Sequence, residues 1–333
     1  MSKRNKIISI IIIVIAAIFI LFFYLANREV PKKIEYGVSF NTMYARELNL
    51  DWKKVYDSIL EDLGVKKLRL AAHWNIIEPE KDKYNFKELD YQIKKAKENN
   101  ASIVLGIGRR LPRWPECHVP GWAIDMSWEE QKEEIKSYIE TVVERYKDEK
   151  HIEMWQVENE PYLTVFAKEH CGDLDEDFLQ EEIDLVKSLD DTREVLITDS
   201  GNLGTWINPY KKGDRFGTSV YVYLWNPDIG PFKSFLTPSF YRAKISLMEI
   251  LFGKKESYLI ELSLEPWLLQ PVVETAKSTQ LERMNIDKFR EIIAFAKETR
   301  FERQYLWGAE WWYFMKEHDY PDFWDEAKNI YKN

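Results

Sequence analysis

The chain has 333 residues, 45% of them hydrophobic, including 13 Trp, 18 Tyr and 17 Phe. This length and composition allow a large buried core, in one big domain or two ordinary ones, and exclude a mainly disordered protein. The formal charge is −9, and without residues 1–27, which hold three basic and no acidic residues, 44 basic residues face 56 acidic ones. Such an acidic surface excludes nucleic acid as a partner, because binding to phosphates depends on basic side chains.

The N-terminal part carries one long apolar segment. A basic tail over residues 1–6 precedes an uncharged stretch over 7–27, about the length that a helix needs to cross a bilayer. A cleavable signal peptide fits less well, because Tyr24 stands where a small residue is wanted before the cut. We predict an uncleaved single-pass anchor in the cell membrane, followed by a linker over 28–33. Basic residues flank the span on both sides, so the positive-inside rule is nearly balanced. We predict an extracytoplasmic domain, partly because of the function argued below, and keep a cytoplasmic one as the alternative.

Eight short runs of β-forming apolar residues follow, at intervals of roughly 25 to 50 residues. An open doubly wound sheet would normally carry a Gly-rich turn after its first strand, and none is found here. Eight alternations of strand and helix therefore predict one closed parallel (β/α)8 barrel over residues 34–333. The runs cover 34–40, 66–72, 102–108, 151–157, 193–199, 216–223, 257–262 and 303–310.

Helical patterns fill nearly every gap between these runs. Their apolar residues recur at spacings of three and four, and Gly64 provides a plausible C-cap for the first of them. The fifth gap, around "NLGTWINPYKKG", has the weakest pattern. The predicted helices cover 51–64, 85–100, 127–149, 176–189, 239–252, 280–299 and 322–331.

Acids stand where the fourth and seventh runs end. Asn159 and Glu160 follow the fourth run in "WQVENEP", and Glu261 closes the seventh in "YLIEL". An acid at the end of an apolar strand is costly unless it is paired, hydrogen-bonded or used. In a barrel the carboxyl ends of the strands converge, so these two carboxyl groups should face each other. Such a pair suits hydrolysis of a glycosidic bond, with retention at a separation of about 5 to 5.5 Å and inversion at roughly 6.5 to 9.5 Å.

These residues resemble clan A of the retaining glycoside hydrolases, the large (β/α)8 group that includes cellulases, mannanases and β-galactosidases. The resemblance covers nearly everything from about residue 34 onward. It implies that Glu160 is the acid/base, that Glu261 is the nucleophile and that Asn159 donates a hydrogen bond to the sugar 2-hydroxyl. It implies no metal or organic cofactor.

Further residues resemble the clan's pattern. Arg69 and Trp74 in "RLAAHWN" match an Arg followed five residues later by Trp, and a nearby arginine would keep the nucleophile ionised. Tyr221 resembles the sixth-strand Tyr that contacts the nucleophile, and Trp307 resembles the eighth-strand aromatic under the sugar. The regions "GIGRR" and "TSVY" lack the His that some cellulase families carry there, so no individual family is assigned.

For several acids and one histidine, the sequence allows two roles. Glu265 rivals Glu261 as nucleophile, but it precedes Pro266 in an expected loop, so we predict a substrate contact for it instead. His73 is either a sugar ligand or structural. Glu310 either contacts the sugar or pairs with the second-strand arginine, and we expect Glu158 on the surface or behind the site.

The two cysteines, Cys117 and Cys171, fall in the loops after the third and fourth runs. Adjacent loops of an exported protein favour a disulfide between them. The neighbouring His118 and His170 leave zinc open, although adjacent ligands fit a tetrahedral site awkwardly, and free thiols are the third alternative.

The combined prediction is a membrane-anchored retaining β-glycosidase that acts as a monomer on an oligo- or polysaccharide. Two alternatives share the same residues. One is a carbohydrate-binding barrel at the cell surface without turnover, and the other is a transglycosylase that remodels envelope glycan.

Overall fold

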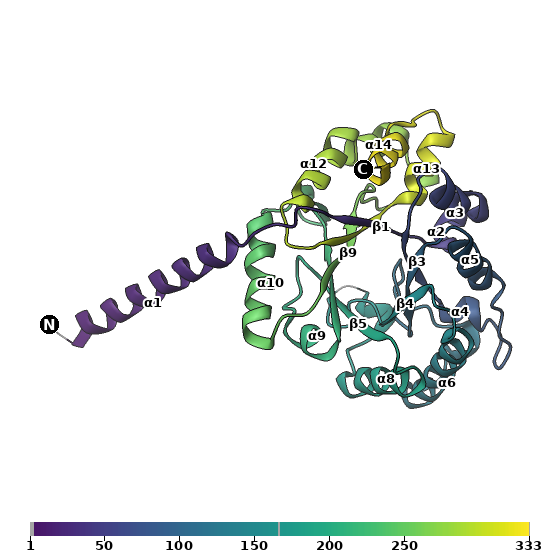
Figure 1. The fold of residues 1–333 in the computed structure, drawn as a ribbon, viewed down its shortest axis with the longest axis horizontal. Coiled ribbons are helices and arrows are strands. Elements are labelled where there is room, and N and C mark those ends of the chain that lie inside the picture. The colour runs from purple at the N-terminus through teal and green to yellow at the C-terminus, as the bar shows by residue number, and fades with distance from the viewer. Residues whose placement is uncertain (1–2, 166, 333) are drawn as a thin grey trace.

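A computed structural model describes residues 3–165 and 167–332, and its centre is a closed barrel of eight parallel strands (Figure 1). Neighbours around the barrel follow the order β1, β10, β9, β6, β5, β4, β3 and β2. The predicted (β/α)8 fold and its eight runs are confirmed. The strands are β1 (Glu35–Ser39), β2 (Lys67–Ala71), β3 (Ser102–Ile107), β4 (Ile152–Val157), β5 (Glu194–Asp199), β6 (Arg215–Val220), β9 (Ser257–Ser263) and β10 (Arg303–Trp307).

Helices surround the barrel, and each predicted helix is present (Figure 1). The span 280–299 is divided in two, because the chain is extended at Met284 and Asn285 then caps a new helix. The weak fifth gap holds a short helix, α9. The helices of the barrel domain are α2 (Thr42–Glu47), α3 (Trp52–Glu61), α4 (Trp74–Ile77), α5 (Lys87–Glu98), α6 (Trp128–Tyr146), α7 (Lys168–Cys171), α8 (Glu176–Leu189), α9 (Ile207–Lys212), α10 (Pro238–Phe252), α11 (Lys277–Arg283), α12 (Ile286–Lys297), α13 (Ala309–Glu317) and α14 (Asp322–Lys332).

Two strand ends differ from the prediction. The sixth strand stops at Val220 because Asn202 takes over the backbone of Tyr221, accepting from its N–H at 3.1 Å and donating to its carbonyl at 3.0 Å. The chain beyond forms a hairpin, β7 (Tyr223–Asn226) and β8 (Gly230–Lys233), that the sequence did not indicate. The eighth strand stops before Gly308, whose φ of 119° turns the chain into α13.

Apolar side chains fill both sides of the barrel wall. The larger core lies between the strands and the helices and includes Trp155, Trp206 and Trp312. A smaller cluster, with Val104 and Tyr305 among its members, fills the interior. The barrel is therefore packed rather than a pore, and its polar chemistry is confined to the mouth.

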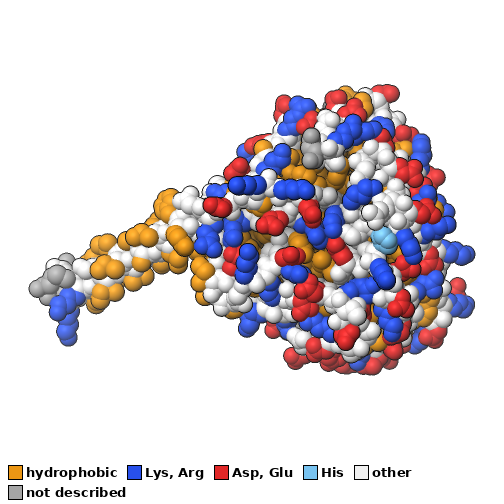
Figure 2. Space-filling view, in the orientation of Figure 1, with side chains coloured by type: hydrophobic (Ala, Val, Ile, Leu, Met, Phe, Trp, Pro, Cys, Tyr) orange, Lys and Arg blue, Asp and Glu red, His pale blue; other side chains and the backbone are white. Residues whose placement is uncertain are grey.

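Helix α1 (Lys3–Ala26) projects from the body (Figure 1) as an apolar rod (Figure 2). Its segment Asn5–Ala26 is long and apolar enough to cross a membrane, by length and composition. Its last turn contacts the barrel domain: Leu25 and Ala26 pack on Ala243 of α10, and Arg242 Nε donates to the Ala26 carbonyl at 2.5 Å.

Gly201, in the loop after β5, provides a test of how tightly the mouth is packed. A Cβ there would lie 1.8 Å from the Ser219 carbonyl oxygen, a backbone atom that cannot yield cheaply. We expect Gly201→Ala to lower the free energy of unfolding by about 1–3 kcal/mol. Gly121→Ala is the matched control, because a Cβ at Gly121 meets nothing within 4 Å. Urea unfolding of the full chain in detergent measures both, and equal midpoints would contradict the expectation.

Candidate active site

The two predicted catalytic acids lie at the mouth of the barrel, at the ends of β4 and β9. Glu160 has a left-handed backbone, with φ of 45°, and its N–H donates to Thr198 Oγ1 at 2.8 Å. This turn explains why Glu160 follows the strand in "WQVENEP": it directs this side chain into the mouth, and the strand does not continue. Glu261 lies within β9, where Oε2 accepts from Arg69 Nη1 at 2.9 Å and Oε1 accepts from the Tyr221 hydroxyl.

The two carboxyl groups have unlike surroundings. The pKa of Glu160 is raised to about 8, first by burial and then by the charge of Glu261, while a hydrogen bond with Ser219 opposes the shift. One oxygen of Glu160 is buried with no hydrogen-bond partner among the described residues. Glu261, by contrast, has an arginine and a phenol bonded to its two oxygens. At neutral pH, Glu160 therefore holds a proton beside a carboxylate that is paired with a cation.

Arg69 connects the residues around Glu261. Its side chain is 2% exposed, and each of its nitrogens donates to a different residue. The acceptors are Gln156 Oε1 at 2.8 Å, Glu261 Oε2 at 2.9 Å and Asn159 Oδ1 at 2.6 Å. Because a guanidinium is planar and rigid, this fork fixes the carboxylate and the amide relative to each other. The predicted contact between Arg69 and Glu261 is present.

A second arginine, Arg113, lies over Trp307. Its guanidinium carbon is 4.0 Å from that ring and 3.6 Å from the ring of Tyr44. It pairs with Glu265, which also accepts from the Trp307 indole at 2.7 Å, and lies 3.5 Å from Glu310. Glu265 is thus engaged away from Arg69, which favours Glu261 as nucleophile. One side of the Trp307 ring is already covered.

The alternative that Glu310 pairs with Arg69 is wrong. Glu310, predicted to close the eighth strand, lies beyond β10 in the first turn of α13, and its cation is Arg113. Its Oε1 accepts from the Asn41 N–H at 2.6 Å. Burial raises the pKa of Glu310 to about 7, Arg113 lowers it and Glu265 raises it.

His73 and Trp74 lie deeper than expected. His73 Nε2 is 3.2 Å from the Pro112 carbonyl, and burial, together with His118, lowers its pKa well below the usual value. Trp74 is fully buried, and its indole donates to Glu78 at 2.8 Å. The structure does not bring Trp74 to the mouth.

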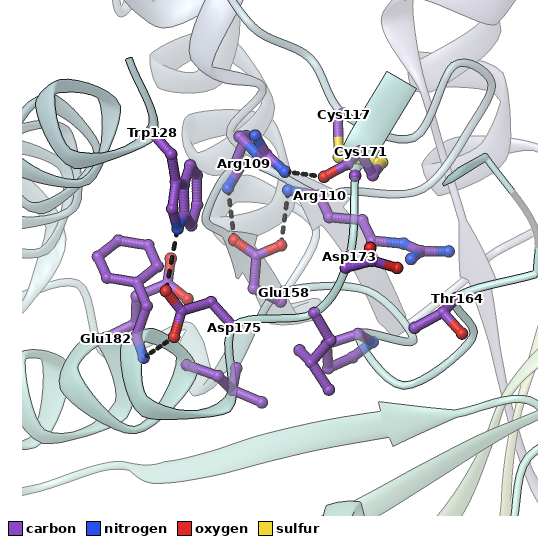
Figure 3. A pocket seen from close by; sticks show the side chains of 15 residues that line it. Arg109, Arg110, Cys117, Trp128, Glu158, Thr164, Cys171, Asp173, Asp175 and Glu182 are labelled. Carbon is purple, nitrogen blue, oxygen red and sulfur yellow. Dashed lines mark hydrogen bonds between the residues drawn. A yellow bond between two sulfur atoms is a disulfide. The ribbon is translucent and has the colours of Figure 1, made fainter. Parts of the chain in front are cut away.

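Glu158 is not a surface residue, contrary to one reading of the sequence, since it is only 7% exposed. Its two oxygens accept from the backbone N–H groups of Arg109 and Arg110, both at 2.6 Å (Figure 3). Burial raises its pKa and that of Glu182 beside it. Glu158 therefore holds the loop after β3 from behind the site.

The predicted disulfide between Cys117 and Cys171 is confirmed, with the two Cα atoms 5.4 Å apart. It borders the same pocket as Glu158 and joins the loops after β3 and β4 (Figure 3). Zinc binding by these cysteines is thereby wrong. Within the described ranges, 3–165 and 167–332, no group of three or more His, Cys, Asp or Glu side chains could hold a metal ion.

Sequence reasoning missed several residues of the mouth. Gln156 and Ser219 carry a usable signal, because both are polar residues near the carboxyl ends of predicted strands. Arg110, Arg113 and Glu116 lie in the loop after β3, which has no periodicity to place them.

Comparisons with known proteins find similarity to glycoside hydrolases. Residues 37–181 match the model of glycosyl hydrolase family 10. Over 165 residues the chain is 26% identical to β-galactosidase LacZ of Lactobacillus acidophilus, covering 43% of this chain and 24% of that protein. It is 29% identical over 131 residues to β-galactosidase BgaA of Clostridium cellulovorans, covering 34% and 20%. The matches thus span at most a quarter of these curated relatives.

Solved structures share the barrel. GH5_18 from Bifidobacterium longum has a TM-score of 0.58 and 14% identity, over 83% of this chain and 70% of that one. A GH10 endoxylanase from a sugarcane soil metagenome has a TM-score of 0.54 and 15% identity, over 83% and 86%. Likeness at this identity shows the fold alone. Together with the family match, it agrees with the resemblance to clan A drawn from the sequence.

The raised pKa of Glu160 has a consequence for stability. Folding lifts it from an ordinary 4.5 to about 8, so the folded state binds this proton more tightly and loses stability as pH rises from about 4.5 through 8. Gln cannot ionise. We expect Glu160→Gln to be more stable than the wild type by a margin that grows between pH 5 and 8, measured by thermal unfolding. Glu169→Gln, on an exposed residue, is the control, and a margin independent of pH would contradict the assignment.

Proposed function

We propose that this chain, a (β/α)8 barrel of the clan A glycoside hydrolase type, is a retaining β-glycosidase with Glu160 as acid/base and Glu261 as nucleophile. The observation that carries the proposal is the asymmetry of the two acids at one mouth. The pKa of Glu160 is raised to about 8 and one of its oxygens has no hydrogen-bond partner among the described residues, while Glu261 is ion-paired with Arg69. Double displacement needs this division between one acid and one nucleophile.

In the first step, Glu160 gives its proton to the glycosidic oxygen while Glu261 attacks the anomeric carbon and the bond to the leaving alcohol breaks. The ester that forms carries no charge on Glu261. Because that charge helps to raise the pKa of Glu160, its loss lowers the pKa just when a base is needed. In the second step, Glu160 accepts a proton from water, which attacks the ester and releases the sugar.

The remaining residues fall into two groups. Arg69 and Tyr221 hold the nucleophile, while Asn159 faces the sugar beside it. Trp307 offers the sugar its uncovered side. Glu265, Glu310 and, more deeply, His73 form the polar border around Arg113 and Pro112.

We also propose that α1 anchors the enzyme in the cell membrane with the barrel outside the cytoplasm. The disulfide supports this side, because disulfides persist in oxidising compartments. The substrate class is an oligo- or polysaccharide with β-linkages, acted on by a monomer.

Trapping tests the catalytic assignment. Full-length protein is incubated with 2-deoxy-2-fluoro β-glycosides of gluco, galacto and manno configuration, and the labelled peptide is mapped. We expect the label on Glu261 in the wild type and also in Glu265→Gln. A label on Glu265, or none with any of the configurations, would overturn the assignment.

Loss of the acid should slow turnover without preventing binding. We expect Glu160→Gln to lower kcat by about 10²–10⁴-fold, the usual contribution of a general acid. The deficit should be smallest for aryl leaving groups that need no protonation. Steady-state kinetics with aryl glycosides of high and low leaving-group pKa measure this, and an equal deficit for both would contradict the role.

Alkaline carbonate extraction tests the anchor. Intact full-length chain of 39.8 kDa should remain in the membrane pellet, since about 20 apolar residues bind a bilayer in effect irreversibly. A variant with Ile11→Asp and Ile15→Asp should be released. Recovery of a shortened, soluble wild-type chain would instead indicate a cleaved signal sequence.

A further inference from the structure

Glu116 is a third acid at the mouth, and the chemistry above does not use it. It lies in the loop between β3 and α6 and is 9% exposed. Its Oε2 accepts from Asn159 Nδ2 at 3.1 Å and lies 3.8 Å from Arg110 Nε. Glu116 therefore lies beside the Asn159 amide, next in sequence to Glu160. On the proposed mechanism, this position is close to the reacting sugar.

The backbone holds this carboxyl group in place. The Glu116 N–H donates to the Arg113 carbonyl at 2.8 Å, and the Glu116 carbonyl accepts from Leu111 at 2.8 Å. Its φ of 71° closes this turn, and the next residue, Cys117, is joined to Cys171. The side chain therefore enters the mouth from a fixed point rather than from a loose loop.

The orientation of Asn159 shows which part of a sugar meets this pair. One guanidinium binds both Glu261, through Nη1, and Asn159, through Nη2, so the amide lies next to the nucleophile. The sugar atoms beside the anomeric carbon are the ring oxygen and C2. Positive charge develops toward the ring oxygen in the transition state, and an N–H donor would oppose it. The Asn159 amide therefore faces the substituent at C2.

We propose that Glu116 is a specificity-determining residue that accepts a hydrogen bond from the 2-hydroxyl of the reacting sugar. The inference rests on the proposed glycosidase function. A hydroxyl both donates and accepts, so it can accept from Asn159 and donate to Glu116. An ammonium at C2 would leave the amide donor without an acceptor, and a deoxy position would leave both groups unmet. The site thus selects glycosides with a free hydroxyl at C2.

The charges around Glu116 are consistent with an acceptor role. Burial raises its pKa to about 7; Arg110 lowers it, Glu261 raises it, and Asn159 and Arg69 lower it. These groups come from its own loop and from β9, β4 and β2. The charge of Glu116 also raises the pKa of Glu160.

The test compares an aryl β-glycoside of the configuration found by trapping with its 2-deoxy analogue. For Glu116→Ala we expect kcat/KM to fall about 10- to 100-fold with the hydroxylated substrate, the range for a hydrogen bond to a charged group. With the deoxy substrate, whose C2 cannot donate, we expect a fall of less than about threefold. Equal losses on both substrates, or none on either, would overturn the inference.

Control variants distinguish a failure of the Glu116 inference from a failure of the glycosidase proposal. Glu169→Gln, on the neighbouring loop, should leave both rates unchanged. Glu116→Gln keeps the shape of the side chain and removes its charge, so its loss of kcat/KM should again be larger with the hydroxylated substrate than with the deoxy analogue; equal losses contradict the inference. If Glu261 is labelled in the wild type while the substrate ratio does not change, only this inference fails. If nothing is labelled, the glycosidase proposal fails as well.

Discussion

The mouth of the barrel depends on one buried cation, Arg69. Its nitrogens bond to Gln156 at the end of β4, to Asn159 just beyond it and to Glu261 on β9, a strand on the other side of the barrel. A buried guanidinium is tolerated because each face of its fork is satisfied. The same bonds fix the distance between Glu261 and the turn that carries Glu160. Closure of the barrel and assembly of the site are therefore one event.

The two carboxyl groups at the mouth differ because they are buried to a similar extent but have different hydrogen-bond partners. Glu160 and Glu261 are both nearly inaccessible, but only Glu261 has a cation and a phenol bonded to its oxygens. Glu160 has only the hydroxyl side chain of Ser219 to offset desolvation. Desolvation without a cation favours the neutral acid, and desolvation with one favours the carboxylate. The two strand ends thus give their carboxyl groups opposite preferences for the proton, which is the division that the proposed mechanism needs.

Elements with a regular spacing of apolar residues can be predicted from the sequence, whereas loop residues without such a spacing cannot. Strands and helices follow from apolar spacing, and Glu160 and Glu261 follow from their places at strand ends. Glu310 is misplaced by one element because Gly308, with its φ of 119°, turns the predicted strand into a helix. The positions of Arg113 and Glu116 cannot be predicted from the sequence. The conformation of their loop depends on the disulfide between Cys117 and Cys171, which are 54 positions apart.

Acidic side chains have different surroundings at the two ends of the barrel. At the bottom, Glu153 lies between Lys67, at 3.1 Å, and Arg303, at 2.6 Å. At the mouth, Glu116 and Glu160 are desolvated with less compensation, so folding raises the pKa of each. Because the pKa values of Glu116 and Glu160 are higher in the folded state, the protein loses folding free energy when the pH exceeds the ordinary pKa of a glutamate. Because burial of the aromatic core stabilises the fold, the mouth can keep carboxyl groups that are costly to ionise.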